Sequence, residues 1–196
     1  VRAELPTTEA LLIGKPQAGK SSIVRGLTGV SSDIIGQGFR PHTQYTQRYA
    51  YPAPDLPLLI FTDTVGLGDL NQNTEALIAD LLRELETESQ RARVLILTVK
   101  ITDFATDSLR TIISQLRRQY AQIPCLLAFT AIQENFSPFY DRAILIDFTL
   151  EEDGYEPIFY GLETLRDTLA ELLPEAEARA IHQLLAGETS KQLGNL

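Results

Sequence analysis

Apolar residues along this chain occur in short continuous runs that alternate with amphipathic stretches. Several of the runs are almost entirely Leu, Ile and Val, which is typical of central strands covered on both faces. The amphipathic stretches repeat apolar residues every three or four positions and therefore predict helices. We predict strands at 10–14, 45–51, 58–63, 94–99, 125–130 and 144–148. We predict helices at 20–27, 74–86, 106–119, 162–172 and 175–186.

The alternation of strands and helices predicts an α/β fold with a doubly wound, mainly parallel sheet and helices on both faces. In such a fold the ligand crevice lies at the carboxyl ends of the strands. The stretch 28–43 shows little periodicity and is predicted to be a long loop. The helix after Pro174 has an apolar stripe of Ile181, Leu184 and Leu185. We expect this stripe either to pack on the domain or to meet a segment absent from this chain.

The length of 196 residues suits a single domain with a sizeable core. We assign residues 1–173 to this domain and 174–196 to a C-terminal helix and tail that lead to a missing segment. The net charge of −9 argues against nucleic acid as a partner. The single cysteine, Cys125, lies in an apolar run and is expected to be buried in a cytoplasmic protein. No apolar run reaches the ~18 residues that span a bilayer, so membrane association is expected only through segments absent from this chain.

Residues 14–22 read Gly-Lys-Pro-Gln-Ala-Gly-Lys-Ser-Ser and contain the complete pattern G-x-x-x-x-G-K-[ST]. The pattern follows a predicted strand and opens a predicted helix, which is the context that a phosphate-binding loop needs. Glycine lets successive backbone N–H groups point at phosphate oxygens, and the helix N-terminus adds its positive dipole end. The alternative is a glycine turn that merely begins a helix. The predicted nucleotide-binding residues in this loop are Gly14, Gln17, Ala18, Gly19, Lys20, Ser21 and Ser22.

A second motif, Asp63-Thr-Val-Gly66, begins 43 residues after Lys20 and ends a predicted buried strand. A carboxylate at this place can hold Mg²⁺ through water, and Ser21 can ligate the same ion. Gly66 can offer its N–H to a γ-phosphate, because it has no side chain to block the approach. The alternative is a strand-ending turn that contains Asp and Gly.

The loop with Lys15-Pro16, the run 61–69 and the order of elements resemble the small GTPase domain of the Era-like, translation-factor-related class. The resemblance covers about residues 9–172, and it implies a three-layer P-loop NTPase fold. This fold is a G domain whose six-stranded sheet has one antiparallel strand. The resemblance also implies GTP or GDP with Mg²⁺, and a threonine of the first switch loop that completes the Mg²⁺ shell. Thr43 matches this threonine best and Thr46 is the alternative, while a dynamin-like GTPase is the second choice of family.

The guanine-specificity motif of the family, Asn/Thr-Lys-x-Asp, is replaced here by Thr130-Ala-Ile-Gln133. Glutamine has one acceptor oxygen where aspartate has two, and the lysine stem that would cover the base is missing. The loss of a charge-assisted pair costs about 1.5–3 kcal/mol. We therefore predict base contacts by Thr130 and Gln133 with the choice of base left open, and backbone contacts by Thr149-Leu150.

Two further positions concern hydrolysis. Leu67 follows Gly66, where Ras-type members have a glutamine that orients the attacking water, so we expect Leu67 to pack within the switch instead. Gln17 stands where potassium-stimulated relatives have an asparagine, so its amide oxygen is a candidate ligand for K⁺. The predicted catalytic residues are Lys20, Thr43, Gly66 and Gln17, and the predicted metal ligands are Ser21, Thr43 and Asp63.

These features predict a GTP-binding protein that hydrolyses GTP slowly with Mg²⁺ and acts as a conformational switch for an unknown protein effector. The alternative is a nucleotide-binding pseudo-GTPase or assembly module with weakened base specificity and little or no hydrolysis. A third hypothesis, an ATPase or small-molecule kinase, needs an Arg-rich lid. Its candidates are Arg91, Arg93, Arg117 and Arg118. The class is also compatible with a homodimer formed through the nucleotide face.

Overall fold

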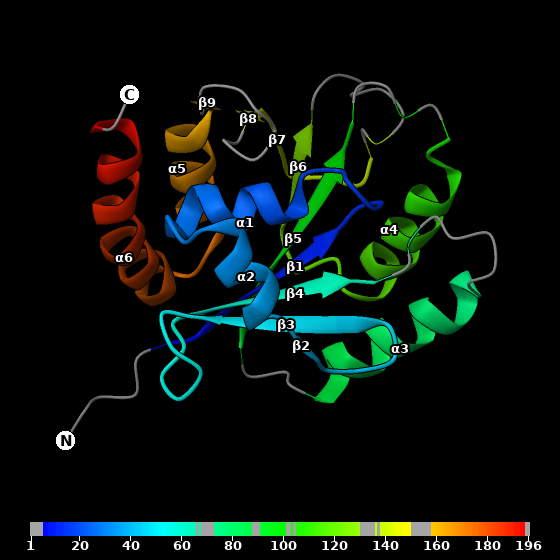
Figure 1. Ribbon diagram of the computed structural model, residues 1–196. Coiled ribbons are helices and arrows are strands. Elements are labelled where there is room, and N and C mark those ends of the chain that lie inside the picture. Colours follow the sequence, from blue (N-terminus) through cyan, green and yellow to red (C-terminus); the bar gives the residue numbers. More distant parts are fainter. Residues whose placement is uncertain are drawn as a thin grey trace.

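A computed structural model of the protein has three layers, with one large sheet between two groups of helices (Figure 1). The structure describes residues 6–65, 67, 73–87, 91–100, 103, 105–129, 136, 138–149 and 158–194. The central strands are the Leu-, Ile- and Val-rich runs of the sequence, which the helices bury from both sides.

In the described part of the chain, the large sheet has seven strands in the order β2-β3-β4-β1-β5-β6-β7. Strand β3 runs antiparallel to both of its neighbours, and the other pairs in this sheet are parallel. Strands β8 and β9 form a separate antiparallel pair. The parallel order brings the carboxyl ends of β1, β4, β5, β6 and β7 to one edge, where the candidate site lies. The bounds are β1 (Thr8–Ile13), β2 (Arg40–Pro41), β3 (Thr46–Tyr51), β4 (Leu59–Thr64), β5 (Ala92–Val99), β6 (Cys125–Phe129), β7 (Arg142–Leu145), β8 (Asp147–Thr149) and β9 (Ile158–Tyr160).

The helices divide between the two faces of the sheet (Figure 1). One group is α1 (Lys20–Thr28), α2 (Ser32–Gly38), α5 (Leu162–Leu172) and α6 (Glu175–Gly194), and the other is α3 (Thr74–Thr87) and α4 (Asp107–Gln119). Side chains alternate along each strand, so Leu12 packs towards the first group and Leu11 towards the second. Ile181 and Leu185 of α6 are buried in the first core, which confirms that the last helix packs on the domain.

The predicted fold class is confirmed, but local details differ from the sequence-based expectation. The sheet has one strand more than the six predicted, because Arg40 and Pro41 pair with β3 as the short strand β2. The stretch 28–43, predicted to be a loop, contains α2, which is anchored by the buried side chain of Ile35. The predicted strand 144–148 is divided at Ile146, and its second part turns away as β8 to pair with β9.

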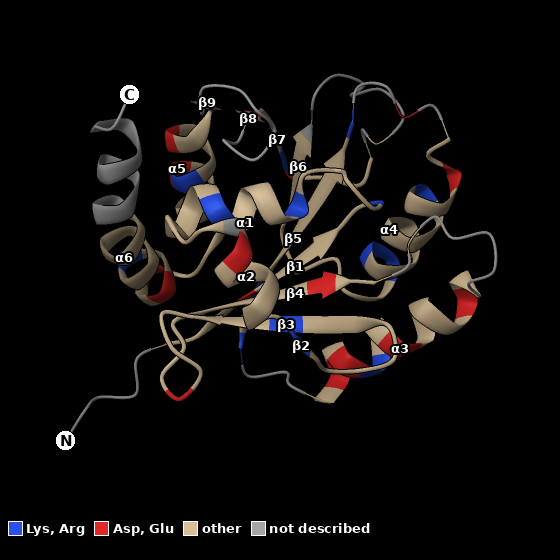
Figure 2. Cartoon of the chain, viewed as in Figure 1, with Lys and Arg blue, Asp and Glu red and all other residues tan. Residues whose placement is uncertain are grey.

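Charge and burial agree with the composition. Figure 2 shows Asp and Glu on α3, α5 and α6, so the acidic excess is spread over several helices. Cys125 is buried as expected, and burial raises the pKa of its thiol to about 12. Among the described residues, no helix is both long and apolar enough to cross a membrane.

Candidate functional site

The predicted phosphate loop joins the end of β1 to the start of α1 at the carboxyl edge of the sheet. Gly14 packs closely on β5, since a Cβ at this position would lie 2.0 Å from Thr98 Oγ1. Gln17 and Gly19 have φ angles of 59° and 91°, in the left-handed region. Glycine adopts this region freely, whereas for Gln17 it costs about 1–2 kcal/mol. The loop thus keeps a strained residue at its tip, as functional loops often do.

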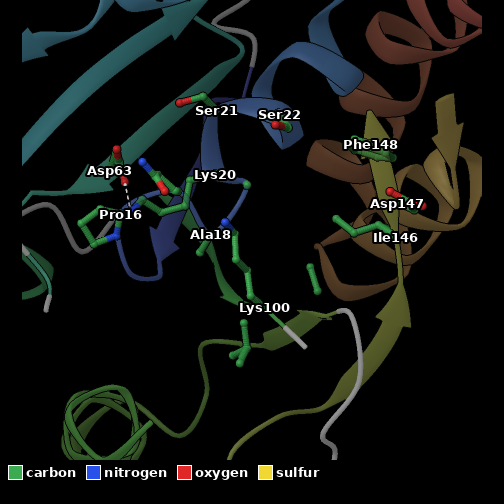
Figure 3. Close-up of a pocket in the computed structure, with 14 residues that line it drawn as sticks. Pro16, Ala18, Lys20, Ser21, Ser22, Asp63, Lys100, Ile146, Asp147 and Phe148 are labelled. Atoms are coloured by element: carbon green, nitrogen blue, oxygen red, sulfur yellow. Dashed lines mark ion pairs between the residues drawn. The ribbon is translucent and has the colours of Figure 1, made fainter. Parts of the chain in front are cut away.

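Lys20 begins α1, and its side chain reaches back across the loop (Figure 3). Its Nζ donates to the carbonyl oxygen of Gly14 at 2.5 Å and lies 3.5 Å from Asp63 Oδ1 on β4. Burial lowers the pKa of Lys20 and raises the pKa of Asp63, while the opposite charge of the partner opposes each shift. The structure therefore brings the two sequence motifs together at one point, with the ammonium group inside the loop.

A cavity of about 780 Å³ opens beside this ion pair, which is large enough for a ligand of nucleotide size. Figure 3 shows the phosphate loop on one side of the cavity and Ile146, Asp147 and Phe148 on the other. The cavity is therefore polar and cationic at one end and partly apolar at the other. Its lining residues are Pro16, Gln17, Ala18, Gly19, Lys20, Ser21, Ser22, Asp63, Val99, Lys100, Ala128, Ile146, Asp147 and Phe148.

Two of the three predicted metal ligands, Ser21 and Asp63, lie on this cavity. Asp63 Oδ1 is buried and accepts no hydrogen bond within the described residues. Asp63 Oδ2 accepts a bond of 3.3 Å from the side-chain amide of Gln47. Carboxylate and hydroxyl oxygens are ligands that Mg²⁺ prefers, and in this structure the cation that faces Asp63 Oδ1 is the Lys20 ammonium at 3.5 Å. The residues present therefore fit a magnesium ion.

Thr43, the third predicted ligand, lies in the turn between β2 and β3 and does not line the cavity. Its hydroxyl donates to Asp80 Oδ2 on α3 at 2.5 Å and accepts bonds from the backbone N–H groups of Tyr45 and Thr46. In this arrangement α3 holds Thr43. The alternative residue, Thr46, is the first residue of β3, and its buried hydroxyl faces Glu84 at 3.4 Å. Of the two threonines, Thr43 is the one that lies in a turn, whereas Thr46 belongs to a strand.

A network of charged side chains, centred on the buried Glu84, joins this turn and β3 to α3. Arg48 Nη2 lies 2.7 Å from Glu84 Oε1 on α3 and 2.9 Å from Glu9 Oε1 on β1. His42 Nε2 approaches the same Glu84 oxygen at 3.1 Å. Burial raises the pKa of Glu84, while Arg48 and His42 act in the opposite direction. The turn before β3 and helix α3 therefore share contacts, so a displacement of one disturbs the other.

Of the other residues predicted from the sequence, some lie among the residues that the structure describes and some do not. Gly66, Thr130 and Gln133 lie outside the described residues. Leu67 is 3% exposed and packs in the core beneath α3, in line with the packing role expected for it. Lys100 and Asp147 on the cavity wall are not among the residues predicted from the sequence. Their signal was positional, because each residue lies directly beyond the carboxyl end of a parallel strand or one residue further.

The model of the family described as 50S ribosome-binding GTPase matches residues 9–131, a span that contains the phosphate loop and Asp63. The comparison with curated proteins gave no match.

Among solved structures, the chain is similar to the Roco2 RocCORdC protein of Methanosarcina barkeri bound to GDP. The identity is 16% and the TM-score 0.50, over 86% of this chain and 49% of that chain. A GTP-binding protein of Sulfolobus solfataricus in complex with GDP is 20% identical with a TM-score of 0.48, over 86% of this chain and 52% of that chain. The chain thus spans about half the length of these proteins, and the first likeness shows the shared fold.

Proposed function

Because the chain belongs to the family described as 50S ribosome-binding GTPase, we propose that it is an Era-like switch that binds GTP and hydrolyses it slowly with Mg²⁺. One observation carries the proposal: Lys20 and Asp63 meet at 3.5 Å on the wall of a cavity of nucleotide size. Ribosome or RNA binding is not part of it, because the net charge of −9 opposes binding of a nucleic acid over a broad surface.

The phosphate loop and Lys20 bind the triphosphate. When a nucleotide binds, the Lys20 ammonium exchanges its present partners, the Gly14 carbonyl oxygen and Asp63, for phosphate oxygens. Ser21 and Asp63 would hold Mg²⁺, whose charge offsets the negative charge that develops between the phosphates. Leu67 is apolar and buried, so it orients no water, and slow hydrolysis follows. The exposed side chain of Gln17 lines the cavity, and we assign it as the residue through which K⁺ would act.

The switch consists of the turn that carries Thr43 and helix α3. In the structure the Thr43 hydroxyl donates to Asp80. In a GTP-bound state Thr43 would leave Asp80 and serve as a further ligand of Mg²⁺, and the contacts of Glu84 with His42 and Arg48 would pass this change to α3. A protein effector in the cytoplasm, or a second copy of the domain across the nucleotide face, then recognises the altered surface.

The second candidate function is a nucleotide-binding assembly module with little hydrolysis and relaxed base choice. The string Thr130–Gln133, which lacks an aspartate, favours it. A kinase is less well supported, because Arg93 is buried against Glu9 at 2.9 Å and is not available for a lid.

The test is turnover and binding of GTP, ATP and XTP by the purified chain, with Mg²⁺ or with EDTA. We expect GTP to bind most tightly and to be hydrolysed slowly, only with Mg²⁺, and faster in potassium than in sodium. A Ser21→Ala variant should lose the Mg²⁺ dependence together with most of the turnover. Tight nucleotide binding without turnover in any salt would favour the assembly module, and preference for ATP would contradict both functions.

A further inference from the structure

Two charged side chains line the nucleotide cavity directly after the strands on either side of β6. Lys100 directly follows β5, and Asp147 begins β8 two residues after the end of β7. Both side chains are exposed and line the cavity. Within the described chain, neither side chain forms a hydrogen bond or an ion pair with another residue. Unpaired charges of opposite sign on a cavity wall are available to a ligand.

Asp147 is held in place by its two neighbours in sequence. Ile146 is only 9% exposed and belongs to the core, and the ring of Phe148 lies 5.7 Å from that of Phe159. The Phe148 ring also packs on α1, where a Cβ at Gly26 would lie 2.9 Å from Phe148 Cε2. Because both neighbours are packed in the core, the backbone at Asp147 is fixed. The short carboxylate side chain therefore stays on the cavity wall (Figure 3).

The two ends of the cavity suit the two ends of a nucleotide. Lys20, Ser21 and the loop amides lie at the phosphate end. Ala128, Ile146 and Phe148 line the other end and offer apolar surface for a purine ring, with Asp147 among them. Guanine presents two adjacent donors, N1–H and the 2-amino group, and a carboxylate presents two acceptor oxygens. Adenine offers an acceptor at N1 and no 2-amino group, so a carboxylate disfavours it.

We propose that Asp147 is the base-specificity residue of this protein and that it accepts hydrogen bonds from guanine N1–H and the 2-amino group. The proposal rests on the function proposed above, namely that the cavity binds a guanine nucleotide. Asp147 supplies the carboxylate that the string Thr130–Gln133 lacks. Lys100 supplies the missing lysine stem, because its side chain extends from the end of β5 towards the phosphate loop (Figure 3).

The test is an Asp147→Asn substitution, measured by calorimetric titration with GTP, ITP and XTP in the presence of Mg²⁺. Asparagine keeps the size but has one acceptor and one donor, so it matches xanthine, which has N1–H beside a carbonyl. We expect GTP affinity to fall about 10- to 100-fold, since a charge-assisted pair is lost, and XTP affinity to rise. The wild type should also prefer GTP over ITP, which lacks the 2-amino group, and this preference should disappear in the variant.

Two controls separate base recognition from other effects. Asp55→Asn makes the same change at an exposed site in the connection that precedes β4, at the opposite edge of the sheet, and should leave all three affinities unchanged. Lys100→Ala should weaken all three nucleotides by a similar factor, and Lys100→Met, which keeps the stem, should weaken them less. If the wild type prefers GTP and Asp147→Asn keeps that preference, the assignment of Asp147 is wrong while the proposed function stands. If the wild type binds no guanine nucleotide, both are wrong.

Discussion

Lys20 and Asp63 are separated by 43 residues in the sequence, yet Lys20 Nζ lies 3.5 Å from Asp63 Oδ1. The contact exists because β1 and β4 are parallel neighbours, with Leu12 paired to Asp63. The end of one strand therefore carries the phosphate loop, and the end of the next carries the acidic residue. Both groups are largely buried, and burial disfavours the charged form of each. The site thus holds two buried charges that a magnesium nucleotide would stabilise.

We predict that Asp63→Asn makes the ligand-free protein at least as stable as the wild type at pH 8. The folded-state pKa of Asp63 is raised above the value of 3.8, so its contribution to stability is present below that value and lost as the pH rises through the folded pKa. Asparagine does not ionise, so the stability of the variant relative to the wild type should increase from pH 4, near the unfolded-state value of Asp63, to pH 8. Urea unfolding in EDTA at both pH values measures this difference. A relative stability that decreases towards pH 8 would contradict the raised pKa.

Gly14→Ala should destabilise the fold and distort the phosphate loop. The new Cβ would lie 2.0 Å from Thr98 Oγ1 and 2.9 Å from the Thr98 carbonyl oxygen, so β1 and β5 must separate. Overpacking of this kind costs about 1–3 kcal/mol in the free energy of unfolding, which urea denaturation measures. Gly36→Ala on α2 is the matched control, since a Cβ there meets no atom within 4 Å. Equal stability of the two variants would show that the close approach of β1 and β5 is not required.

Asp80→Ala should raise the affinity for a non-hydrolysable GTP analogue relative to GDP. Asp80 accepts a hydrogen bond of 2.5 Å from the Thr43 hydroxyl, and only the triphosphate state is proposed to need Thr43 at the metal. Loss of one hydrogen bond to a charged group corresponds to about 1.5 kcal/mol, or roughly a tenfold change in the affinity ratio. Calorimetric titration with both nucleotides provides the measurement, and the GDP titration is the internal control. If both affinities changed by the same factor in the variant, the proposed role of Thr43 in the switch would be wrong.

Cys125 should resist alkylation in the folded protein at pH 8. It is the single cysteine of the chain, and burial raises the pKa of its thiol to about 12, so the reactive thiolate is scarce and shielded. Labelling should become rapid only as urea unfolds β6, which makes the thiol a probe of global unfolding. Rapid labelling without denaturant would mean that β6 opens locally.

The sequence predicted the parts of the site that depend on local pattern. The phosphate loop has its own sequence signature, and Asp63 could be placed because it ends a buried run at the right separation from the loop. Helix α2 was missed because it is short, contains two glycines and buries mainly Ile35, so it shows no helical repeat. A helix this short is stabilised by tertiary packing more than by its own sequence, so the sequence pattern alone does not predict it.

Lys100 and Asp147 could not be predicted as a pair from the sequence. They are 47 residues apart, and they flank one cavity only because β5, β6 and β7 are consecutive parallel neighbours. The contact between Thr43 and Asp80 was likewise invisible, since it depends on how α3 packs beside β3. In both cases the order of strands and the docking of helices decide which side chains meet.

The central claim is that Lys20 and the loop around it bind a magnesium-bound guanine nucleotide. Calorimetric titration of Mg²⁺–GTP into the wild type and into Lys20→Ala tests it most directly, with circular dichroism to show that both are folded. We predict saturable one-to-one binding by the wild type and a loss of at least about 100-fold in the variant, since Lys20 is the ammonium group assigned to the phosphates. Equal GTP affinity in the two proteins, or no binding by the wild type, would contradict the assignment of this site.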